Sequence, residues 1–360
     1  TELEQRMVDW VRRFVGLPDA FDGLILDTAS TSSFTALLAA REQAVPDVRQ
    51  RGLAGRRDVG PCVLYLSEEA HSSVDKAALA AGFGLDQVRH IPVDEKLRMV
   101  PAALETAIRA DRAAGLIPVM VCATIGTTST TSVDPVREIS EICERMGIWL
   151  HVDAAYAGPA AALPEKRGEF EGWERADTIV LNPHKWMSTP IDCSILLFRD
   201  AAAMRRPLAL TPEYLRSDED GSNLMDIGLS LGRRFRALKL WFQFRMEGAE
   251  GLRERLRRHI ALAGELAGWI EADARFEILA PHPFSLVVFR AIPPGSADPD
   301  EWNRRLLEAV NRDGRVFLSH TAVGDRFALR LAVGSARGTE ASVIEAWHIL
   351  KDQYDRMAAD

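Results

Sequence analysis

The sequence predicts an α/β protein, with a large domain built on a mostly parallel sheet and a smaller C-terminal α+β domain. Three observations support this. The chain has 360 residues, 47% of them hydrophobic and 27% charged, which is an ordinary globular composition with enough length for more than one core. Between about residues 60 and 200, short apolar β-rich runs alternate with amphipathic helical stretches. After Gly232 the composition changes to a long basic helical stretch. We therefore predict domains at 1–238 and 239–360.

The β-rich runs lack polar alternation, which is typical of strands that are buried on both faces of a parallel sheet. They cover residues 62–66, 88–93, 117–123, 148–152, 178–182 and 194–198. Ligands of such sheets bind at the carboxyl ends of the strands. The loops that follow these runs are therefore the first place to look for functional residues.

Helix-like segments separate the runs, and they are expected on both faces of the sheet. They cover residues 73–81, 101–114, 135–146 and 159–174. Upstream, the hydroxyl-rich turn 28–33 precedes Phe34, Leu37 and Leu38, and we predict that it caps the start of another helix. That helix start offers unpaired N–H groups and a positive dipole, so it is a candidate phosphate site.

The C-terminal region predicts a smaller α+β domain. A helical stretch over 233–270 is broken near 248–251, and strand-like runs follow at 285–290 and 327–333, with a closing helix at 339–357. Before it, the segment 206–230 is long, polar and weakly periodic. A loop of that length in a compact chain is usually functional or mobile.

The charge balance narrows the classes of partner. There are 44 basic and 52 acidic side chains, so the net charge is −8, which argues against nucleic-acid and anionic-membrane partners. The longest apolar stretch, near 115–126, is too short to span a bilayer. Four cysteines lie far apart in apolar settings, which is typical of reduced core residues in a cytoplasmic protein. The chain begins at Thr1, already inside a helical pattern.

Lys185 is the first candidate catalytic residue. It lies in the run Asn182-Pro183-His184-Lys185-Trp186, directly after a predicted strand that Pro183 ends. Lys185 is therefore expected at the carboxyl edge of the sheet. Its neighbours His184, Trp186 and Met187 are expected to desolvate the amine in part and lower its pKa toward that of an imine-forming lysine. The alternative is a solvated surface lysine.

Asp153 is the second candidate, because it ends the strand at 148–152 and so lies at the same edge, 32 residues before Lys185. A pyridoxal phosphate site needs this combination, with a lysine to bind the aldehyde and a carboxylate to keep the pyridine nitrogen protonated. The small Ala155 would let a ring lie close to the strand end. The alternative for Asp153 is a helix N-cap.

Two further groups are expected at this edge. His71 follows the strand at 62–66 and opens a helix, where its imidazole can stack on a pyridine ring while Ser72 or Ser73 caps the helix. The run 125–128 ends another strand and offers the hydroxyls of its threonines. A metal site is the competing interpretation, with His151, Asp153 and His184 as ligands, but their spacing is poor for metal binding and no cysteine joins them.

Together these motifs resemble one known family. The motifs are HSSVDKA (71–77), TIGTT (124–128), HVDAAYAG (151–158), NPHKW (182–186), DCS (192–194) and LGRRFRALKLWF (231–242). They are similar to those of the group II pyridoxal-phosphate-dependent decarboxylases, and most of all to the aromatic L-amino acid decarboxylases. The similarity runs from Met7 to about residue 355, and the combination of motifs is highly specific.

The resemblance implies a fold-type-I, PLP-dependent transferase-like fold, a homodimer with the site at the subunit interface, and pyridoxal 5'-phosphate as cofactor. It implies that Lys185 binds the cofactor covalently and that Asp153 pairs with the pyridine nitrogen. His71 would stack on one face of the ring and Ala155 on the other, with Thr128 near the phenolic oxygen. The remaining implied cofactor contacts surround the phosphate: Ala29, Ser30, Asn182 and His184.

The implied reaction is the decarboxylation of an L-amino acid to its amine and CO2. Tyr214 matches the family's mobile-loop tyrosine, which returns a proton to the substrate carbon. Gly232 matches a substrate-pocket position where the aromatic-specific members carry glycine, which favours an aromatic substrate. The family's turn usually has Gly at position 27 and an acidic residue at position 31, where this chain has Asp27 and Thr31. The family's N-terminal segment, which wraps the partner subunit, is missing before Thr1.

Two alternatives stay open. One is an oxygen-consuming aldehyde synthase of the same family, a branch that typically replaces the loop tyrosine with phenylalanine, so that Tyr214 argues against it. The other is a catalytically silent homologue that acts as a binding protein. The retained Asp153–Lys185 pair argues against that role, because burying unused charged groups is costly.

Overall fold

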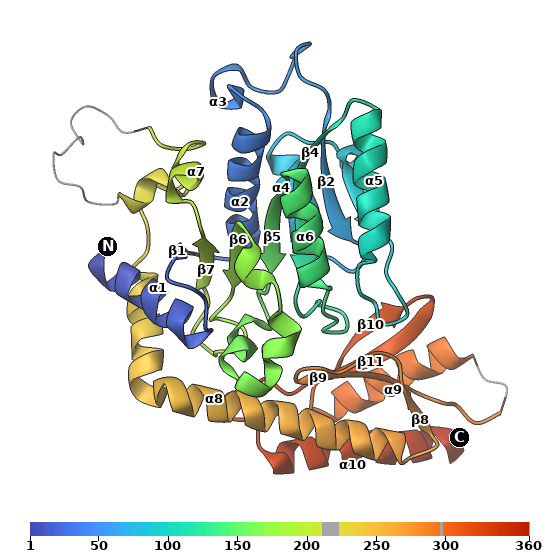
Figure 1. Cartoon of the computed structure of the whole chain (residues 1–360). Helices are drawn as coiled ribbons and strands as arrows, with labels where there is room; N and C mark the ends of the chain where they lie inside the picture. Colours follow the sequence, from blue (N-terminus) through green and yellow to red (C-terminus); the bar gives the residue numbers. More distant parts are fainter. Residues whose placement is uncertain (211–222, 296–297, 360) are drawn as a thin grey trace. The chain divides into compact units, whose positions relative to one another are not determined.

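The computed structural model describes residues 1–210, 223–295 and 298–359, and they form two compact units (Figure 1). Unit 1 contains residues 1–125 and 133–252, and unit 2 contains residues 126–132 and 253–360. The boundary predicted from the sequence, after residue 238, lies within unit 1, near the start of the long helix α8 (Arg236–Glu271). The short segment 126–132 belongs to unit 2 although both of its neighbours in the chain belong to unit 1.

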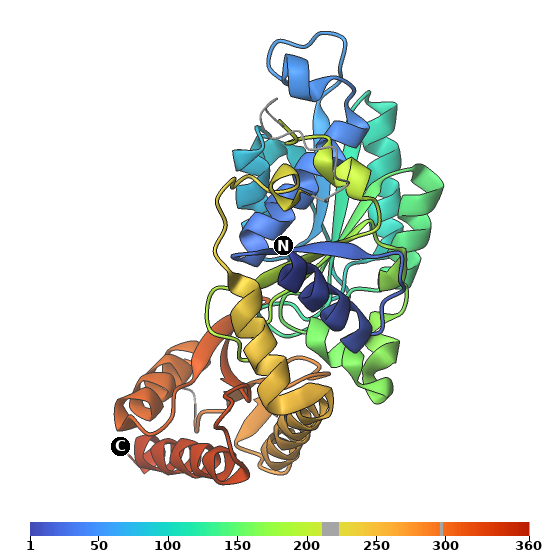
Figure 2. The same cartoon turned by 90° about the vertical axis from the view of Figure 1, so that its left-hand side faces the viewer.

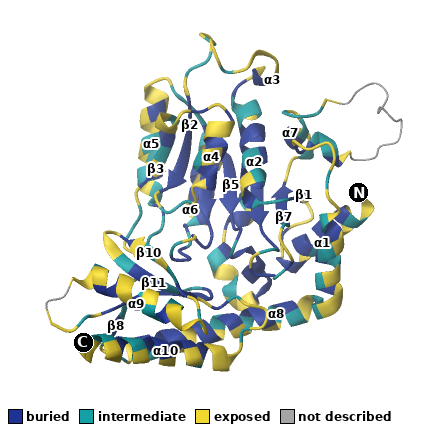
Figure 3. Ribbon diagram, turned by 180° about the vertical axis from the view of Figure 1, so that it is seen from behind, coloured by how far each residue is buried: buried dark blue, intermediate teal, exposed yellow. Residues whose placement is uncertain are grey.

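Unit 1 is built on one seven-stranded sheet with the order β1-β7-β6-β5-β4-β2-β3. Its strands are β1 (Asp22–Leu26), β2 (Cys62–Ser67), β3 (Val88–Ile91), β4 (Ile117–Thr124), β5 (Trp149–Asp153), β6 (Thr178–Leu181) and β7 (Ser194–Phe198). Six of these were predicted as apolar runs, and β2, β4, β5, β6 and β7 are buried along nearly their whole length (Figure 3). The predicted α/β fold is confirmed.

The sheet is mixed, and β7 is the strand that makes it so. Strands β3, β2, β4, β5 and β6 pair in parallel, whereas β7 is antiparallel to both β6 and β1. Strand β1 was not expected from the sequence. Ser194, the first residue of β7, pairs with Leu26, the last residue of β1. Because β7 is also antiparallel to β6, it begins at the same edge at which the parallel strands end.

Helices cover both faces of this sheet (Figure 2). Helices α2, α4 and α7 pack on one face, and α5 and α6 lie together on the other. The helices of unit 1 before α8 are α1 (Glu2–Phe14), α2 (Ala29–Ala44), α3 (Val48–Arg51), α4 (Ser73–Ala80), α5 (Pro101–Ala113), α6 (Val136–Met146) and α7 (Ala201–Arg205), with short 3-10 turns at Leu85–Gln87 and Leu224–Asp226. Helices α4, α5 and α6 lie where the periodicity predicted them.

The helix predicted over 159–174 does not form. The chain instead makes three 3-10 turns, Gly158–Ala162, Pro164–Phe170 and Trp173–Arg175. Pro164 lacks the N–H that a continuous helix would need there, and Gly172 adopts a left-handed φ of +90°. The apolar spacing suited a helix, but these two residues interrupt it.

Unit 2 contains an antiparallel sheet with the order β10-β11-β9-β8. Its strands are β8 (Phe276–Ile278), β9 (Leu286–Ala291), β10 (Ser319–Val323) and β11 (Arg326–Ala332). The runs predicted at 285–290 and 327–333 are β9 and β11, whereas β8, β10 and the helix α9 (Pro299–Asp313) were not predicted. The closing helix is α10 (Glu340–Ala359), and α8 is interrupted at Gly248, where φ is +69°, within the predicted break.

Each unit has its own apolar core. In unit 1, helix α2 and the strands bury a cluster that includes Leu37, Leu64 and Trp149, and in unit 2 Phe289, Trp302 and Trp347 pack between the sheet and its helices. All four cysteines are buried and unpaired. Among the helices of the described ranges, none combines the length and the hydropathy that crossing a membrane requires.

Candidate active site

Most of the predicted site residues of unit 1 gather at one edge of the sheet, where β5 and β6 end and β7 begins. Asp153 is the last residue of β5, and its backbone pairs with Thr124 of β4 and Val180 of β6. Lys185 follows β6 by four residues, and Leu181 at the end of β6 pairs with Ile195 near the start of β7. This is the edge where α/β sheets bind their ligands.

The carboxylate of Asp153 is oriented by its own loop. Asp153 is 5% exposed, and its Oδ1 accepts a hydrogen bond from the N–H of Ala155 at 3.0 Å. Among the described residues, the second carboxylate oxygen has no hydrogen-bond donor. One oxygen therefore fixes the side chain while the other is free to pair with a ligand.

Lys185 lies on a loop that is tied to the Asp153 loop. The N–H of Asn182 donates to the carbonyl of Ala155 at 3.0 Å, and the rings of Trp186 and Tyr156 stack with centroids 4.9 Å apart. Trp186 is only 1% exposed, whereas Lys185 is exposed and has no ion pair among the described residues. The expected desolvation of the amine by its neighbours does not occur within one chain, because Trp186 and Met187 turn into the core instead.

A small apolar patch and an unpaired polar atom lie between these loops. Ala29, Ala155 and Val180 form one buried cluster, so the structure brings two predicted cofactor contacts together. Asn182 is buried, and its Oδ1 has no hydrogen-bond partner in the described residues. A buried amide oxygen without a partner is unfavourable, so this atom marks a place where a ligand group that donates a hydrogen bond would be stabilised.

His184 is held in one tautomer by the segment before β7. The N–H of Cys193 donates to His184 Nδ1 at 2.9 Å, and the N–H of His184 donates to the Cys193 carbonyl at 3.3 Å. Nδ1 is therefore the acceptor, and the ring proton lies on Nε2. Burial, together with the positive charge of Lys185, lowers the pKa of His184. The neutral ring can donate one hydrogen bond from Nε2 to a ligand.

His71 caps helix α4 with its own ring. The N–H of Ser73 donates to His71 Nδ1 at 3.1 Å, and the Ser73 hydroxyl lies 2.8 Å from the same nitrogen. Contrary to the expectation, neither serine caps the helix with its side chain. Ser72 makes no capping hydrogen bond, and the Ser73 hydroxyl contacts the His71 ring instead. The ring of His71 is exposed at the edge where β2 ends, and this suits it to stacking on a ligand.

Helix α2 begins at the same edge, as predicted. Thr28 is its N-cap, and the Thr28 hydroxyl accepts from the N–H of Thr31 at 3.4 Å. The N–H of Thr28 donates to the Asp27 carboxylate at 2.7 Å. The N–H groups of Ala29 and Ser30 in the first turn have no carbonyl partner within the helix, so they are free to bind an anion.

His151 is a structural residue and not a metal ligand. It is fully buried, with Nδ1 2.9 Å from the Thr178 hydroxyl and Nε2 3.0 Å from the Ser33 hydroxyl. Burial lowers its pKa to about 4, so the ring is neutral. Both ring nitrogens are occupied, and the described residues contain no group of metal-ligating side chains.

Three predicted residues are not brought into this cluster. Thr128 belongs to unit 2, where Arg330 donates hydrogen bonds to the carbonyls of Thr128 and Ser129. Gly232 is exposed in the chain just before α8. Tyr214 lies outside the described residues.

Arg233 and Arg236 have roles that sequence reasoning missed. The fork of Arg236 binds both carboxylate oxygens of Asp192, at 2.9 and 3.1 Å, and Lys239 lies 3.7 Å from the same carboxylate. Arg233 donates to the carbonyl of Ile25 at 2.7 Å and pairs with Glu4 of helix α1. The available signal was several arginines within one apolar motif, LGRRFRALKLWF, from which only Gly232 was selected.

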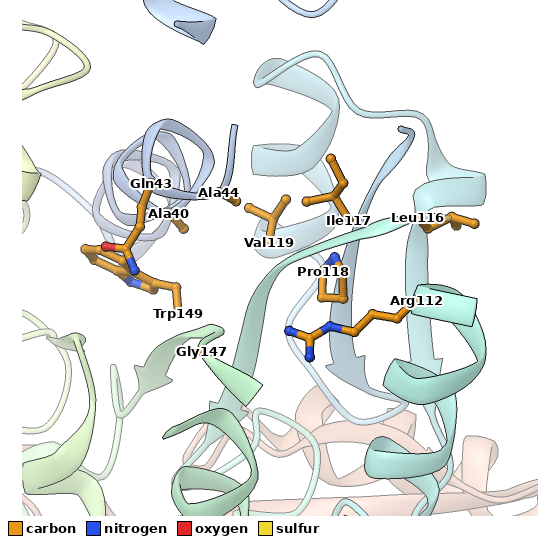
Figure 4. Close-up of a pocket in the computed structure, with 10 residues that line it drawn as sticks. All are labelled: Ala40, Gln43, Ala44, Arg112, Leu116, Ile117, Pro118, Val119, Gly147 and Trp149. Atoms are coloured by element: carbon orange, nitrogen blue, oxygen red, sulfur yellow. The ribbon is translucent and has the colours of Figure 1, made fainter. Parts of the chain in front are cut away.

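A cavity of about 400 Å³ lies at the opposite edge of the sheet, where β4 and β5 begin (Figure 4). Its one charged lining residue is Arg112, whose guanidinium donates to the carbonyl of Met146. The lining carries no nucleophile and no acid–base pair, and consists of Ala40, Gln43, Ala44, Arg112, Leu116, Ile117, Pro118, Val119, Gly147 and Trp149. This cavity therefore offers none of the catalytic residue types that lie at the Asp153–Lys185 edge.

The comparison with known families agrees with this geometry. A family model described as the pyridoxal-dependent decarboxylase conserved domain matches residues 1–292. This chain belongs to that family. The decarboxylase is 39% identical to tyrosine decarboxylase 2 of Narcissus pseudonarcissus, over 98% of this chain and 72% of that protein. It is 38% identical to phenylacetaldehyde synthase of Arabidopsis thaliana, over 98% of this chain and 74% of that protein.

Among solved structures, the decarboxylase is similar to the crystal structure of Oryza sativa TDC with PLP and tryptamine. The TM-score is 0.94 at 38% identity, over 99% of this chain and 76% of the other. The predicted fold type, the enzyme class and the cofactor are confirmed by these matches. The protein is a pyridoxal-phosphate-dependent carboxy-lyase of amino-acid metabolism.

The residues of unit 1 fit the cofactor. Its groups are a phosphate, a pyridine ring and an aldehyde, and the edge offers a partner for each. Free N–H groups at the start of α2 lie beside a buried apolar patch, the free oxygen of Asp153 lies at the strand end, and the amine of Lys185 is unpaired. This decarboxylase thus has the donors and acceptors that its family's cofactor requires.

Proposed function

We propose that this decarboxylase converts an aromatic L-amino acid to the corresponding amine and CO2. The observation that carries the proposal is the placement of Asp153 and Lys185 on adjoining strand ends whose loops are joined by the Ala155–Asn182 hydrogen bond and the Tyr156–Trp186 stack. The names of similar proteins, tyrosine and tryptophan decarboxylases, support an aromatic substrate.

When bound, pyridoxal phosphate supplies an electron sink for the electron pair that CO2 leaves behind. The free oxygen of Asp153 would hold the proton on the pyridine nitrogen, because Ala155 already fixes the other oxygen. Lys185 would bind the cofactor aldehyde and yield it to the substrate amine. These two side chains form the catalytic pair of the proposal.

The remaining cofactor contacts extend the resemblance to residues of this edge. Ala29 and Ser30 would donate backbone N–H groups to the phosphate at the positive end of α2. The side-chain amide N–H of Asn182 and the Nε2–H of His184 would donate to the same group. His71 and Ala155 would enclose the two faces of the ring. The role of Thr128, a contact with the phenolic oxygen, rests on its motif position alone.

Two residues would act on the substrate. Tyr214 would donate a proton to the substrate Cα after CO2 leaves, from a loop that excludes water. Gly232 would leave room for an aromatic side chain. Both assignments rest on the matching motif positions of the family.

A second candidate is an aldehyde synthase, favoured by the similarity to the phenylacetaldehyde synthase of Arabidopsis thaliana. In that reaction oxygen takes up the electron pair that CO2 leaves on the substrate. In the amine-forming reaction that pair would bind the proton that Tyr214 donates. The presence of Tyr214 favours the amine-forming decarboxylase.

We also propose a cytoplasmic homodimer with the site at the subunit interface. Large apolar side chains are exposed just before α8 and in its first three turns, with Leu231 77%, Phe235 61% and Met246 82% exposed in the single chain. A cluster of exposed apolar side chains of this kind marks a protein–protein contact. The four buried, unpaired cysteines are typical of a reducing compartment.

The function is tested with the purified protein and pyridoxal phosphate. We expect a yellow complex, borohydride reduction that attaches the cofactor to the peptide containing Lys185, and CO2 release from tyrosine or tryptophan in amounts equal to the amine. Lys185→Ala should lose all three, whereas Lys76→Ala, on the exposed side of α4, should keep them. Cofactor reduced onto another lysine of the wild-type protein would disprove the assignment.

A further inference from the structure

The ion pair between Asp192 and Arg236 connects the start of helix α8 with the loop that precedes β7. The Nε and Nη2 atoms of Arg236 reach the two oxygens of Asp192 at 2.9 and 3.1 Å. Both side chains are mostly buried, 13% and 20% exposed. A fork of this kind fixes the orientation of the carboxylate as well as its position.

The residue after Asp192 holds the residue before the catalytic lysine. Cys193 exchanges two backbone-mediated hydrogen bonds with His184, one of which fills Nδ1 of the ring. Cys193 itself is fully buried, and burial raises the pKa of its thiol to about 12, so that it stays uncharged. The position of the Cys193 N–H is thus set by its neighbours, Asp192 on one side and strand β7 on the other.

We propose that Asp192 and Arg236 are positioning residues, whose ion pair fixes the loop before β7 and thereby holds His184 in its Nε2–H tautomer beside Lys185. The inference rests on the proposed function of His184 and Lys185. Neither Asp192 nor Arg236 is assigned a contact with cofactor or substrate. They act through the backbone of Cys193.

The charges around the pair fit this role. Arg236 holds the pKa of Asp192 down to about 2, so the carboxylate stays ionised through the physiological range. The Arg236 guanidinium is also stabilised by the more distant carboxylate of Asp27, at the start of the proposed phosphate turn. Lys239 adds a second positive charge 3.7 Å from Asp192. Asp192 therefore has two positive partners, and Arg236 has two negative ones.

The experiment compares Arg236→Gln, Asp192→Asn and the double variant in the enzyme saturated with pyridoxal phosphate. Arg236→Lys keeps the charge but loses the fork. The matched control is Arg89→Gln, which removes a fork of the same kind on Asp111, with N–O distances of 2.9 and 3.1 Å, from the outer strand β3. Thermal midpoints of all variants separate a general loss of stability from a local effect.

The first measurement is the protonation pattern of His184, read by long-range ¹H–¹⁵N NMR of ¹⁵N-histidine protein and assigned with His184→Asn. Wild-type enzyme should show an unprotonated Nδ1. Arg236→Gln and Asp192→Asn should show both tautomers in exchange, and Arg89→Gln should match wild type. This signal does not depend on turnover, so it decides the positioning role even if the proposed reaction is wrong.

The second measurement is kinetic and spectroscopic. Arg236→Gln and Asp192→Asn should lower kcat by roughly tenfold to hundredfold, because small misplacements near reacting groups have effects of that size. KM should change by less than about threefold, since neither residue contacts substrate. The pH midpoint of the cofactor's visible absorption should shift in the same variants. The kcat of the double variant should be no lower than that of either single variant, because each removes the same ion pair. The kcat of Arg236→Lys should lie between those of wild type and Arg236→Gln.

Three results would overturn the proposal. One is a wild-type His184 signal in Arg236→Gln, and another is an unchanged absorption midpoint with normal kcat. The third is additive losses in the double variant, which would mean that the two residues act separately. A wild-type enzyme that fails to form a reducible bond with the cofactor would instead disprove the proposed function.

Discussion

At the scale of single residues, the site separates groups that hold the loops from groups that remain free to react. The backbone N–H of Ala155 donates a hydrogen bond to one oxygen of Asp153. In the same way, the N–H of Cys193 donates to one nitrogen of His184, and the N–H of Ser73 donates to one nitrogen of His71. In each case the local backbone fixes the side chain through one atom and leaves the other atom available. Such preorganisation reduces the reorganisation that binding or reaction would otherwise require.

Asp153→Asn should separate cofactor binding from turnover. The amide can still accept a hydrogen bond from Ala155, so the cofactor should stay bound. The amide cannot hold a proton on the pyridine nitrogen, so we expect the transition state to lose about 3–4 kcal/mol of stabilisation. This loss corresponds to a decrease in kcat by a factor of roughly several hundred. Cofactor content by absorbance and amine formation by chromatography check this. Turnover close to that of wild type would reduce Asp153 to a loop cap.

His151 should make stability depend on pH. Its pKa is about 4 in the fold against an ordinary 6.5, so the stability that its neutral ring contributes is present above pH 6.5 and is lost as the pH falls toward 4. Between pH 7 and pH 5 this one residue should lower the free energy of unfolding by about 2 kcal/mol. Urea unfolding of His151→Asn at both pH values should show a difference smaller by that amount. His348→Asn, at an exposed position of α10, is the control and should behave as wild type.

Tyr214→Phe tests the step after CO2 leaves. Without the phenol, the substrate carbon has no positioned proton donor, while the remaining electrons are accessible to oxygen. The variant should still release CO2, but with aldehyde, ammonia and peroxide in place of much of the amine. Amine, aldehyde and oxygen uptake are measured in parallel. An unchanged amine yield without oxygen consumption would exclude Tyr214 from the mechanism.

At the scale of elements, close approach of backbones sets the distance between the two catalytic loops. Gly158 follows the Asp153 loop, and a Cβ at this position would lie 2.7 Å from the Cβ of Leu181 at the end of β6. A side chain there would push apart the elements that carry Asp153 and Lys185. The glycine in the motif HVDAAYAG is therefore needed for packing.

Gly158→Ala should destabilise the fold by about 1–3 kcal/mol, as expected for overpacking. It should also lower kcat, because Leu181 directly precedes the Asn182–Lys185 loop. Gly168→Ala is the matched control, since a Cβ there meets no atom within 4 Å. Thermal unfolding and steady-state kinetics of both variants provide the comparison. Equal stability of the two variants would contradict the packing argument.

The sequence predicted strands and helices where one physical signal dominated. The runs that became β2, β4, β5 and β6 are uniformly apolar, and the strand-then-polar pattern placed Asp153 and Lys185 at their shared edge. Strand β1 was not recognised because it lies before the alternating region and pairs with a strand more than 160 residues later. The direction of β7 depends on that same pairing, which local periodicity does not encode.

The site was predictable only where a residue type suggested its own chemistry. Lys185 and Asp153 are informative from their type and position alone. Asp192 and Arg236 are ordinary charged residues in sequence, and only their meeting across 44 positions gives them a role. The tautomer of His184 likewise depends on Cys193, which reads as a simple core residue.

At the scale of the whole molecule, the proposed homodimer predicts that the exposed apolar side chains of α8 are covered in solution. Phe242→Glu together with Met246→Glu should place charges in that contact and shift the protein toward monomer. Phe317→Glu, at an exposed position of unit 2, should leave assembly unchanged. Sedimentation velocity across a range of concentrations distinguishes these outcomes. If the double variant sediments as wild type does, the subunit interface does not include these side chains of α8.

The pairing of β1 with β7 also determines the order in which the molecule can be completed during synthesis. Strand β1 ends at Leu26, and strand β7 ends at Phe198. At a synthesis rate of about 5–20 residues per second, the ribosome needs roughly 10–30 s to add the residues between these two positions. Throughout that interval β1 has no partner from its own sheet, and an unpaired apolar strand readily joins other chains. The decarboxylase therefore has a defined window in which a nascent chain is vulnerable, and that window closes only when β7 has left the ribosome.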